Sequence, residues 1–173
     1  VFDGKGVAPD VKVEKLMLSD ISASLITKNL FFEYATNYRI KNDSIKPVAD
    51  FTFSDAEYAD FVKFLDGKDY AYTTESEDLL AKLELTTKEE KYFDDVKTEY
   101  EHLKEKLNTH KKDDLKKFKE EIITILETEI VGRYYYQNGT IQNSLKRDPT
   151  LEVAIKTIKN DTLYKSILAG TNK

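Results

Sequence analysis

Apolar residues recur at helical spacing along most of the chain. From residue 19 onward they return every three or four positions, the period of a helix with one buried face. The run 7–14 differs, because Val11 and Val13 alternate with charged neighbours, a pattern typical of a short exposed strand. The pattern predicts a mainly α fold, with a short N-terminal strand remnant followed by a helical domain of about six or seven helices.

Capping residues mark where the first helices begin and end. Ser19 is the predicted N-cap of a helix that ends near Asn42. Ser54 and Glu57 form a predicted capping box, in which the two side chains satisfy free backbone N–H groups at a helix start. Gly67 is expected to close that second helix, since glycine favours the backbone conformation that ends helices.

A long antiparallel helical hairpin is predicted in the middle of the chain. A short helix over residues 75–85 precedes it, and residues 87–90 form a second predicted capping box. Apolar residues spaced 3 and 4 apart then fall into two stretches on either side of a polar break at 108–112, namely Phe93, Val96, Tyr100, Leu103 and Leu107, then Leu115, Phe118, Ile122 and Ile125. Two such seams predict coiled-coil-like packing, with Leu103 and Ile122 buried across the hairpin.

Further breaks divide the last part of the chain. The second helix of the predicted hairpin runs to about Tyr136, where Asn138-Gly139 marks a turn. Asp148-Pro149 predicts a capped helix with proline at its first position. Asp161 is the predicted cap of a final short helix that ends at Gly170.

Composition narrows the classes of function. Charged residues make up 34% of the 173 residues, above the roughly 25% of an ordinary domain, which suits long helices with one wet face. The net charge of −5, with both signs interspersed, lacks the basic stripe that nucleic-acid binding needs. No apolar run approaches the roughly 18 residues of a membrane span. The absence of cysteine excludes disulfides, thiol catalysis and thiolate metal sites.

Two pairs of polar residues are candidates for chemistry. Ser24 and Lys28 share a helix turn, but the sequence around them supplies no strand, glycine-rich turn or oxyanion donors for nucleophilic catalysis. Glu99 and His102 offer two metal ligands where a site needs about four. His110 is expected to be solvated in the predicted turn. We therefore assign no catalytic, cofactor-binding or metal-binding residue to the chain.

The densest aromatic cluster is the candidate interface. It consists of Arg133, Tyr134, Tyr135 and Tyr136. Successive residues of a helix point in different directions, so at most two of the tyrosines can share the core. Exposed tyrosine beside arginine is common in protein interfaces. Packing in the core and contact with a partner both remain open for this cluster.

Residues 3–13 read D-G-K-G-V-A-P-D-V-K-V. This run resembles the signature that closes the protease domain of carboxyl-terminal processing (tail-specific) serine peptidases, with Lys5 in place of a glycine. A tight glycine turn there delivers an edge strand, and Pro9 lies where no ladder donor is needed. The stretches 51–55 and 129–135 also resemble the helical C-terminal extensions of envelope members of that family.

The resemblance implies a parent enzyme with a serine nucleophile, a lysine general base and a PDZ domain that captures the C-termini of protein substrates. All of these lie upstream of the signature, so no catalytic residue is carried over and this chain alone is expected to be no enzyme. Residues 1–15 would end the protease domain and residues 16–173 would form the helical C-terminal domain. We expect the chain to begin within a longer protein of the bacterial periplasm or cell envelope.

On this interpretation the helical domain braces the protease core, mediates self-association as a homo-oligomer, or helps to recognise substrates. The alternative is a free-standing helical module for protein–protein interaction. The strand over 7–14 either stays loose, held only where Val11 or Val13 touches the helices, or pairs with residues 70–74 or with a second copy of itself. Residues 1–6 are expected to be poorly anchored, since few apolar side chains offset the cost of ordering them.

Overall fold

The computed structural model describes residues 9–13 and 17–171, with the backbone alone for residues 109–112. Within these residues it has nine α-helices, one short 3-10 helix and no strand. In chain order they are α1 (Asp20–Thr27), α2 (Leu30–Lys41), α3 (Asp55–Phe64), α4 (Glu75–Glu89), α5 (Phe93–Lys112), α6 (Asp114–Lys117), α7 (Lys119–Ser144), η1 (Leu145–Arg147), α8 (Pro149–Lys159) and α9 (Asp161–Leu168). The mainly α fold is confirmed, with more helices than the predicted six or seven.

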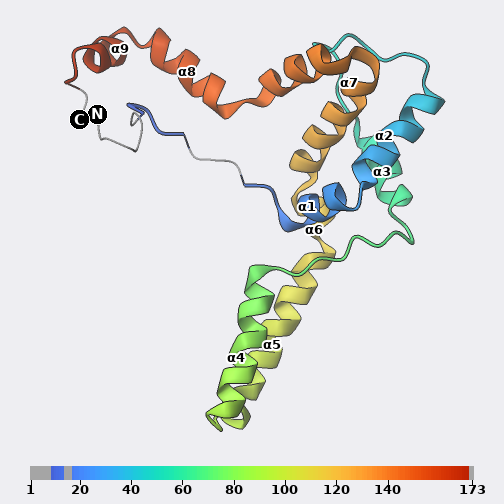
Figure 1. Ribbon diagram of the computed structural model, residues 1–173, viewed down its shortest axis with the longest axis vertical. Helices are drawn as coiled ribbons and strands as arrows, with labels where there is room; N and C mark the ends of the chain where they lie inside the picture. Colours follow the sequence, from blue (N-terminus) through green and yellow to red (C-terminus); the bar gives the residue numbers. More distant parts are fainter. Residues whose placement is uncertain (1–8, 14–16, 172–173) are drawn as a thin grey trace.

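The helices form three parts (Figure 1). The body consists of α1, α2, α3 and α7. The hairpin, α4 and α5 side by side, projects from the body, and α6 joins α5 to α7. The arm, α8 followed by α9, extends from the body in another direction. Only the body has the thickness to bury a core.

Aromatic side chains of α2 and α3 meet aliphatic side chains of α7 in that core. Phe61 is fully buried, stacks on Phe31 with ring centroids 5.6 Å apart, and receives the edge of Tyr34 at 5.1 Å. From α7 come the fully buried Ile122, Leu126 and Ile130. The expected apolar face of α7 is confirmed, but it packs against α2 and α3 and not against α5.

The first predicted helix is in fact two. Ser19 caps α1 as predicted, because its side chain accepts a hydrogen bond from the backbone N–H of Ser22. The chain then breaks at Asn29, whose φ of 58° lies in the left-handed region that asparagine tolerates better than most residues. The break lets α2 turn so that Phe31 and Tyr34 reach the core.

The helix α3 follows the sequence pattern closely. The predicted capping box of Ser54 and Glu57 is present in both directions. Gly67 follows the helix with a φ of +74°, a conformation that costs glycine little and most residues more. Both predicted ends of this helix are confirmed.

The second predicted capping box is wrong. The box that opens α4 is made by Thr74 and Glu77, and α4 continues through Thr87 to Glu89. The hydroxyl of Thr87 donates to the carbonyl oxygen of Leu83 at 2.8 Å, one turn back within the same helix. Threonine has this alternative partner inside a helix, so its presence did not mark a helix start.

The hairpin pairs α4 with α5, whereas the sequence pattern paired α5 with α7. The chain reverses at Lys91, whose φ is 63°. Leu80 and Tyr100, each 6% exposed, lie at the seam, where the Tyr100 hydroxyl donates to Glu84 Oε2 at 2.6 Å. Phe93 packs on Tyr100 with ring centroids 5.5 Å apart.

Leu103 and Ile122 therefore do not face each other. Leu103 is 47% exposed on the hairpin, while Ile122 is fully buried in the body. The polar run 108–112 contains neither glycine nor proline, so α5 continues through it to Lys112 and residue 110 is helical. Polar composition without a breaker was too weak a signal for a turn.

The helix α7 folds back on itself at Tyr136, whose φ of 55° and ψ of −155° are not helical. The reversal lies at the predicted end of this helix, but Asn138-Gly139 belongs to the returning segment. A Cβ atom on Gly139 would come within 2.3 Å of the Tyr135 Cβ, so only glycine allows the two segments to approach this closely. The Asn143 amide ties the segments by donating to Thr128 Oγ1 at 3.2 Å.

The expected N-terminal strand remnant is not found. Residues 9–13 form no strand, and residues 1–8 and 14–16 lie outside the described residues, as does the expectation for residues 1–6. The proposed partner segment 70–74 is also without strand.

The caps of the arm agree with the sequence in part. Asp148 caps α8 and Pro149 opens it, as predicted. The cap of α9 is Asn160, one residue before the predicted Asp161, because the Asn160 side chain reaches the Leu163 N–H. The helix ends at Leu168, two residues before Gly170.

Replacing Leu80 by alanine tests the seam of the hairpin. Leu80 is 6% exposed and Leu85, on the same helix, is 64% exposed. Leu80→Ala should lower the free energy of unfolding by about 2–5 kcal/mol, while Leu85→Ala should change it by less than about 0.5 kcal/mol. Urea unfolding followed by circular dichroism measures both values. Equal losses would show that the seam does not pair these helices.

Two buried tyrosines predict a loss of stability at alkaline pH. The Tyr34 hydroxyl donates to the Glu57 carbonyl and that of Tyr58 to the Leu115 carbonyl. Burial raises the pKa of both from 10.0 to about 12. The unfolded chain gives up these protons first, so their contribution is complete below about pH 10 and is lost as the pH rises to about 12. Thermal melts at about pH 9 and pH 11 should differ less for Tyr58→Phe than for the wild type, and identical differences would contradict this origin.

Candidate functional site

Ser24 and Lys28 each contact the segment that follows α3, and not each other. The Ser24 hydroxyl lies 2.9 Å from the Tyr70 carbonyl oxygen, to which it donates. Lys28 Nζ lies 2.6 Å from Asp69 Oδ2, and its hydrogen bond lowers the pKa of that carboxyl group. A serine whose proton is engaged and a lysine paired with a carboxylate are not arranged as nucleophile and base. The pair fixes the segment after α3 against α1.

The two histidines lie on α5. Glu99 and His102 are both exposed on that helix, and the side chain of His110 lies outside the described residues. Within the described part of the chain, no three His, Cys, Asp or Glu side chains gather where they could hold a metal ion. Among the described helices, none combines the length and apolar character that crossing a membrane requires.

Arg133 of the candidate interface is bound within the body. Its guanidinium donates to the carbonyl oxygens of Glu129 at 2.6 Å and Phe32 at 2.8 Å, and lies 4.6 Å from the centre of the Phe32 ring. Its side chain is only 16% exposed. With these contacts made, Arg133 braces α7 against α2 and has little left to offer a partner.

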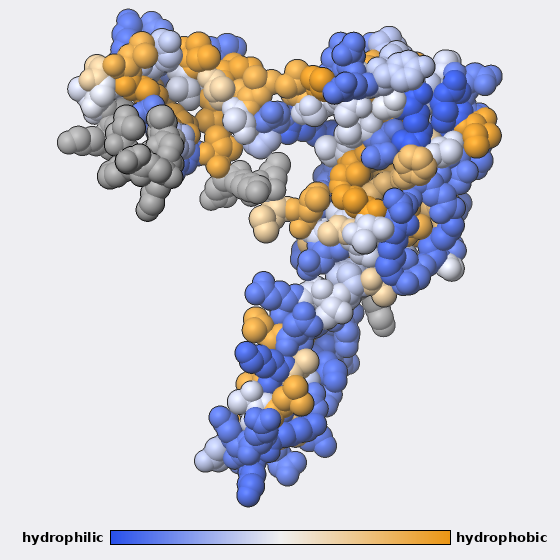
Figure 2. Space-filling view, viewed as in Figure 1, coloured by the Kyte–Doolittle hydropathy of each residue, from blue (hydrophilic) through white to orange (hydrophobic). Residues whose placement is uncertain are grey.

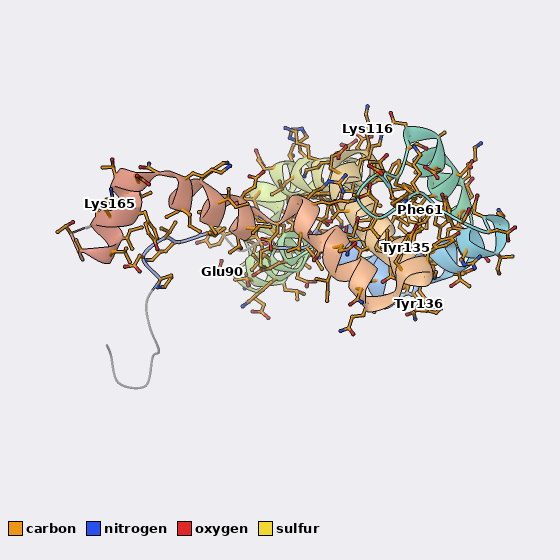
Figure 3. The ribbon with its side chains drawn as sticks, turned by 90° about the horizontal axis from the view of Figure 1, so that it is seen from above. Phe61, Glu90, Lys116, Tyr135, Tyr136 and Lys165 are labelled. Carbon is orange, nitrogen blue, oxygen red and sulfur yellow. The ribbon has the colours of Figure 1, made fainter. Side chains whose placement is uncertain are left out.

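The three tyrosines of the cluster divide as their helical directions predicted. Tyr134 donates to the Asn42 carbonyl at 2.6 Å, and Tyr135 donates to the carbonyls of Ile45 and Lys46. Both pack against the core. Tyr136 is 78% exposed and has the strained backbone of the α7 reversal, and it lies beside Tyr135 at the edge of the body in Figure 3. The prediction of an interface here now rests on Tyr136.

A groove runs between α2 and α7 next to this cluster. Phe32 and Ile40 form its apolar wall and are 60% and 75% exposed. Gly132 and Thr140 lie on its other side, with Arg39 among its lining. The groove has the apolar wall and polar rim of a contact surface, but Arg39 is partly engaged, because it lies 4.7 Å from the centre of the Tyr134 ring.

The sequence patterns missed a buried carboxylate that joins three segments. Glu127 of α7 is 1% exposed. Its Oε1 accepts the Phe53 N–H at 2.9 Å, and its Oε2 lies 2.6 Å from Arg147 Nη1. Its position offered a signal, because Glu127 lies four residues from both Ile123 and Val131, in the middle of an apolar stripe. An acid inside such a stripe requires a partner.

The arm presents an amphipathic surface outside the body. Neither α8 nor α9 contains a buried residue. Their exposed apolar residues are Leu151, Ile155, Ile158, Tyr164 and Leu168, at 36%, 43%, 63%, 41% and 71% exposure. Figure 3 shows Lys165 on the arm, far from Phe61 in the body. The body therefore does not cover this surface.

The contacts of Glu127 with Phe53 and Arg147, here called the Glu127 clamp, can be tested by substitution. Glu127→Ala leaves the buried Phe53 N–H without its acceptor, so the free energy of unfolding should fall by about 1–3 kcal/mol. Glu127→Gln keeps one acceptor oxygen and should lose less. Glu120 is an exposed acid in the first turn of α7, and Glu120→Ala should cost at most about 1 kcal/mol. Chemical unfolding measures the three variants, and a Glu127→Ala loss no larger than that of Glu120→Ala would contradict the clamp.

Comparison with known proteins adds one family. Residues 21–158 match the family model described as "Probable PDZ-protease, C-terminal helical domain". No curated protein and no solved structure matches the chain. The matched range includes nearly all of the body, the whole hairpin and nearly all of α8. The chain therefore belongs to the family of C-terminal helical domains of probable PDZ-proteases.

Proposed function

We propose that this chain is the non-catalytic C-terminal domain of a serine-type carboxyl-terminal processing peptidase, and that it supports proteolysis by bracing the upstream PDZ and protease domains. The family supports a protease parent with a PDZ domain. The run 3–13 supports the carboxyl-terminal processing type, since it resembles the end of that protease domain. The engaged side chains of Ser24 and Lys28 support a non-catalytic role.

The observation on which bracing rests is the uncovered arm. In α8 the apolar residues Leu151, Ala154, Ile155 and Ile158 recur at positions i, i+3, i+4 and i+7, which puts them on one side of the helix. Helices of this length gain most of their stability by packing such a stripe against another element. In this chain no residue of α8 is buried within the described residues, so the stripe stays largely exposed. A surface on the parent protein would supply such an element.

The start of the arm is held firmly on the body, as a brace requires. Arg147, the last residue before the cap of α8, pairs with the buried Glu127. Lys146 donates to the Phe51 carbonyl at 2.9 Å. The arm thus leaves from a fixed point, so that contact at its far end would limit how the parent domains move relative to the body.

A free-standing interaction module is the alternative. It would present the same arm to a separate protein, and variants of the arm would then leave the parent's own activity unchanged. The place of the parent in the bacterial periplasm or cell envelope is part of our proposal, and fractionation of cells that produce the intact parent tests it. Recovery of the parent only from the cytoplasmic fraction would contradict that placement.

The arm is tested in the purified parent peptidase with two neighbouring variants of equal charge change. Ile155→Glu puts a carboxylate into the proposed contact and should lower both the melting temperature and the rate of peptide hydrolysis, because an unpaired charge is costly to bury. Lys156→Gln, with a side chain 75% exposed, should change neither. The isolated chain should melt alike with either variant, since both positions are exposed in it. An unchanged parent with Ile155→Glu would contradict the bracing role.

A further inference from the structure

The hairpin has a second apolar face besides its seam. The seam buries Leu80 and Tyr100. Besides Leu85, four large apolar side chains of α4 and α5 are exposed, namely Leu79 (60%), Leu83 (49%), Val96 (39%) and Leu103 (47%). Apolar patches accordingly interrupt the hydrophilic surface of the hairpin in Figure 2. These four residues define the outer face, a surface separate from the arm.

Helix geometry places all four on the same side. The inward line of each helix is the side that faces the other helix of the hairpin. Counted around the helix axis at about 100° per residue, Leu79 and Leu83 lie roughly 80–120° before the inward line of α4. Val96 and Leu103 lie roughly 40–60° before the inward line of α5. Because the two helices run antiparallel, both rotations lead to one face of the hairpin. The opposite face has Lys97 on α5.

The outer face matches a copy of itself in reversed direction. The hydrogen bond from Tyr100 to Glu84 sets these two residues at about the same height along the hairpin. Leu103 comes three residues after Tyr100. The midpoint between Leu79 and Leu83 comes three residues before Glu84. Because the helices are antiparallel, these two positions lie at the same height. A twofold axis at this height, perpendicular to the helices, brings Leu79 against Leu83 of a second copy and the two Leu103 side chains together.

The charges at the edge of this face fit the same axis. Glu99 and Lys106 are seven residues apart on the outer edge of α5, and their midpoint lies half a residue from Leu103. Neither side chain has an ion pair within the described part of the chain. The axis that matches the leucines sets Lys106 of one copy level with Glu99 of the other, twice by symmetry. One register thus satisfies both the apolar and the charged positions.

We propose that this face is a self-association surface, on which two hairpins pack antiparallel as a four-helix bundle. The area fits a weak dimer. The 15 residues of α4 and 20 of α5 span roughly 22 and 30 Å, and two helices side by side are about 20 Å wide, so about 1,000 Å² would be buried in total. That is the lower limit for a specific interface, the size class of weak and transient contacts.

Charge exchange in this chain tests the dimer. Sedimentation between about 1 µM and 1 mM should show a monomer–dimer equilibrium. Lys106→Glu sets like charges against each other at two places, and should raise the dissociation constant by about tenfold, as should Glu99→Lys. The double variant Glu99→Lys/Lys106→Glu restores opposite charges across the axis, and should return the constant to within about threefold of the wild type. Leu83→Asp should abolish the dimer.

Lys97→Glu is the matched control, because it makes the same charge change as Lys106→Glu on the opposite face of α5. It should leave the dissociation constant unchanged. Helix content by circular dichroism should be the same for all charge variants, since these side chains are exposed. A chain that stays monomeric to about 1 mM would overturn the proposal and leave the face to another occupant. A dimer that responds alike to Lys97→Glu and Lys106→Glu, or that the double variant fails to restore, would overturn it equally.

Discussion

The buried carboxylate of Glu127 is the contact on which the arrangement of the chain depends. It lies inside the apolar stripe of α7, where an unpaired charge would be costly. The Phe53 N–H and the Arg147 guanidinium satisfy it, so the segment before α3 and the segment before α8 are both fixed to the same point of α7. Removing either partner would leave a buried charge short of a donor, which is why these three segments hold one geometry.

The molecule has one part with a complete core, the body, and two projections with exposed apolar faces, the hairpin and the arm. The body buries its aromatic and aliphatic side chains around Phe61 and Ile122. The hairpin and the arm leave exposed the stripes that give amphipathic helices most of their stability. The exposed apolar faces of these two projections are the basis of the contacts that we propose for the arm and for the outer face of the hairpin. The arm and the hairpin leave the body in different directions and can serve different contacts (Figure 1).

The candidate interface shows how far side-chain reasoning could go from the sequence. Helical directions correctly limited the core to two of the three tyrosines, and the structure shows that Tyr136 is the exposed one. They could not show that Arg133 spends its donors on Glu129 and Phe32, because Phe32 is about a hundred residues away in the chain. The role of Glu127 was hidden in the same way, although an acid within an apolar stripe signalled that a partner existed.

Local signals in the sequence were sufficient for the mainly α class, the caps at Ser19, Ser54 and Asp148, and the apolar face of α7. These features depend on neighbours within one or two helical turns, where the chain's own geometry sets the contacts. The pairing of helices was another matter, because the seam of α5 fits α4 and α7 equally well as a pattern. Long-range packing decided it, through the reversal at Lys91, the continuation of α5 across its polar run, and the attraction of α7 into the aromatic core of the body.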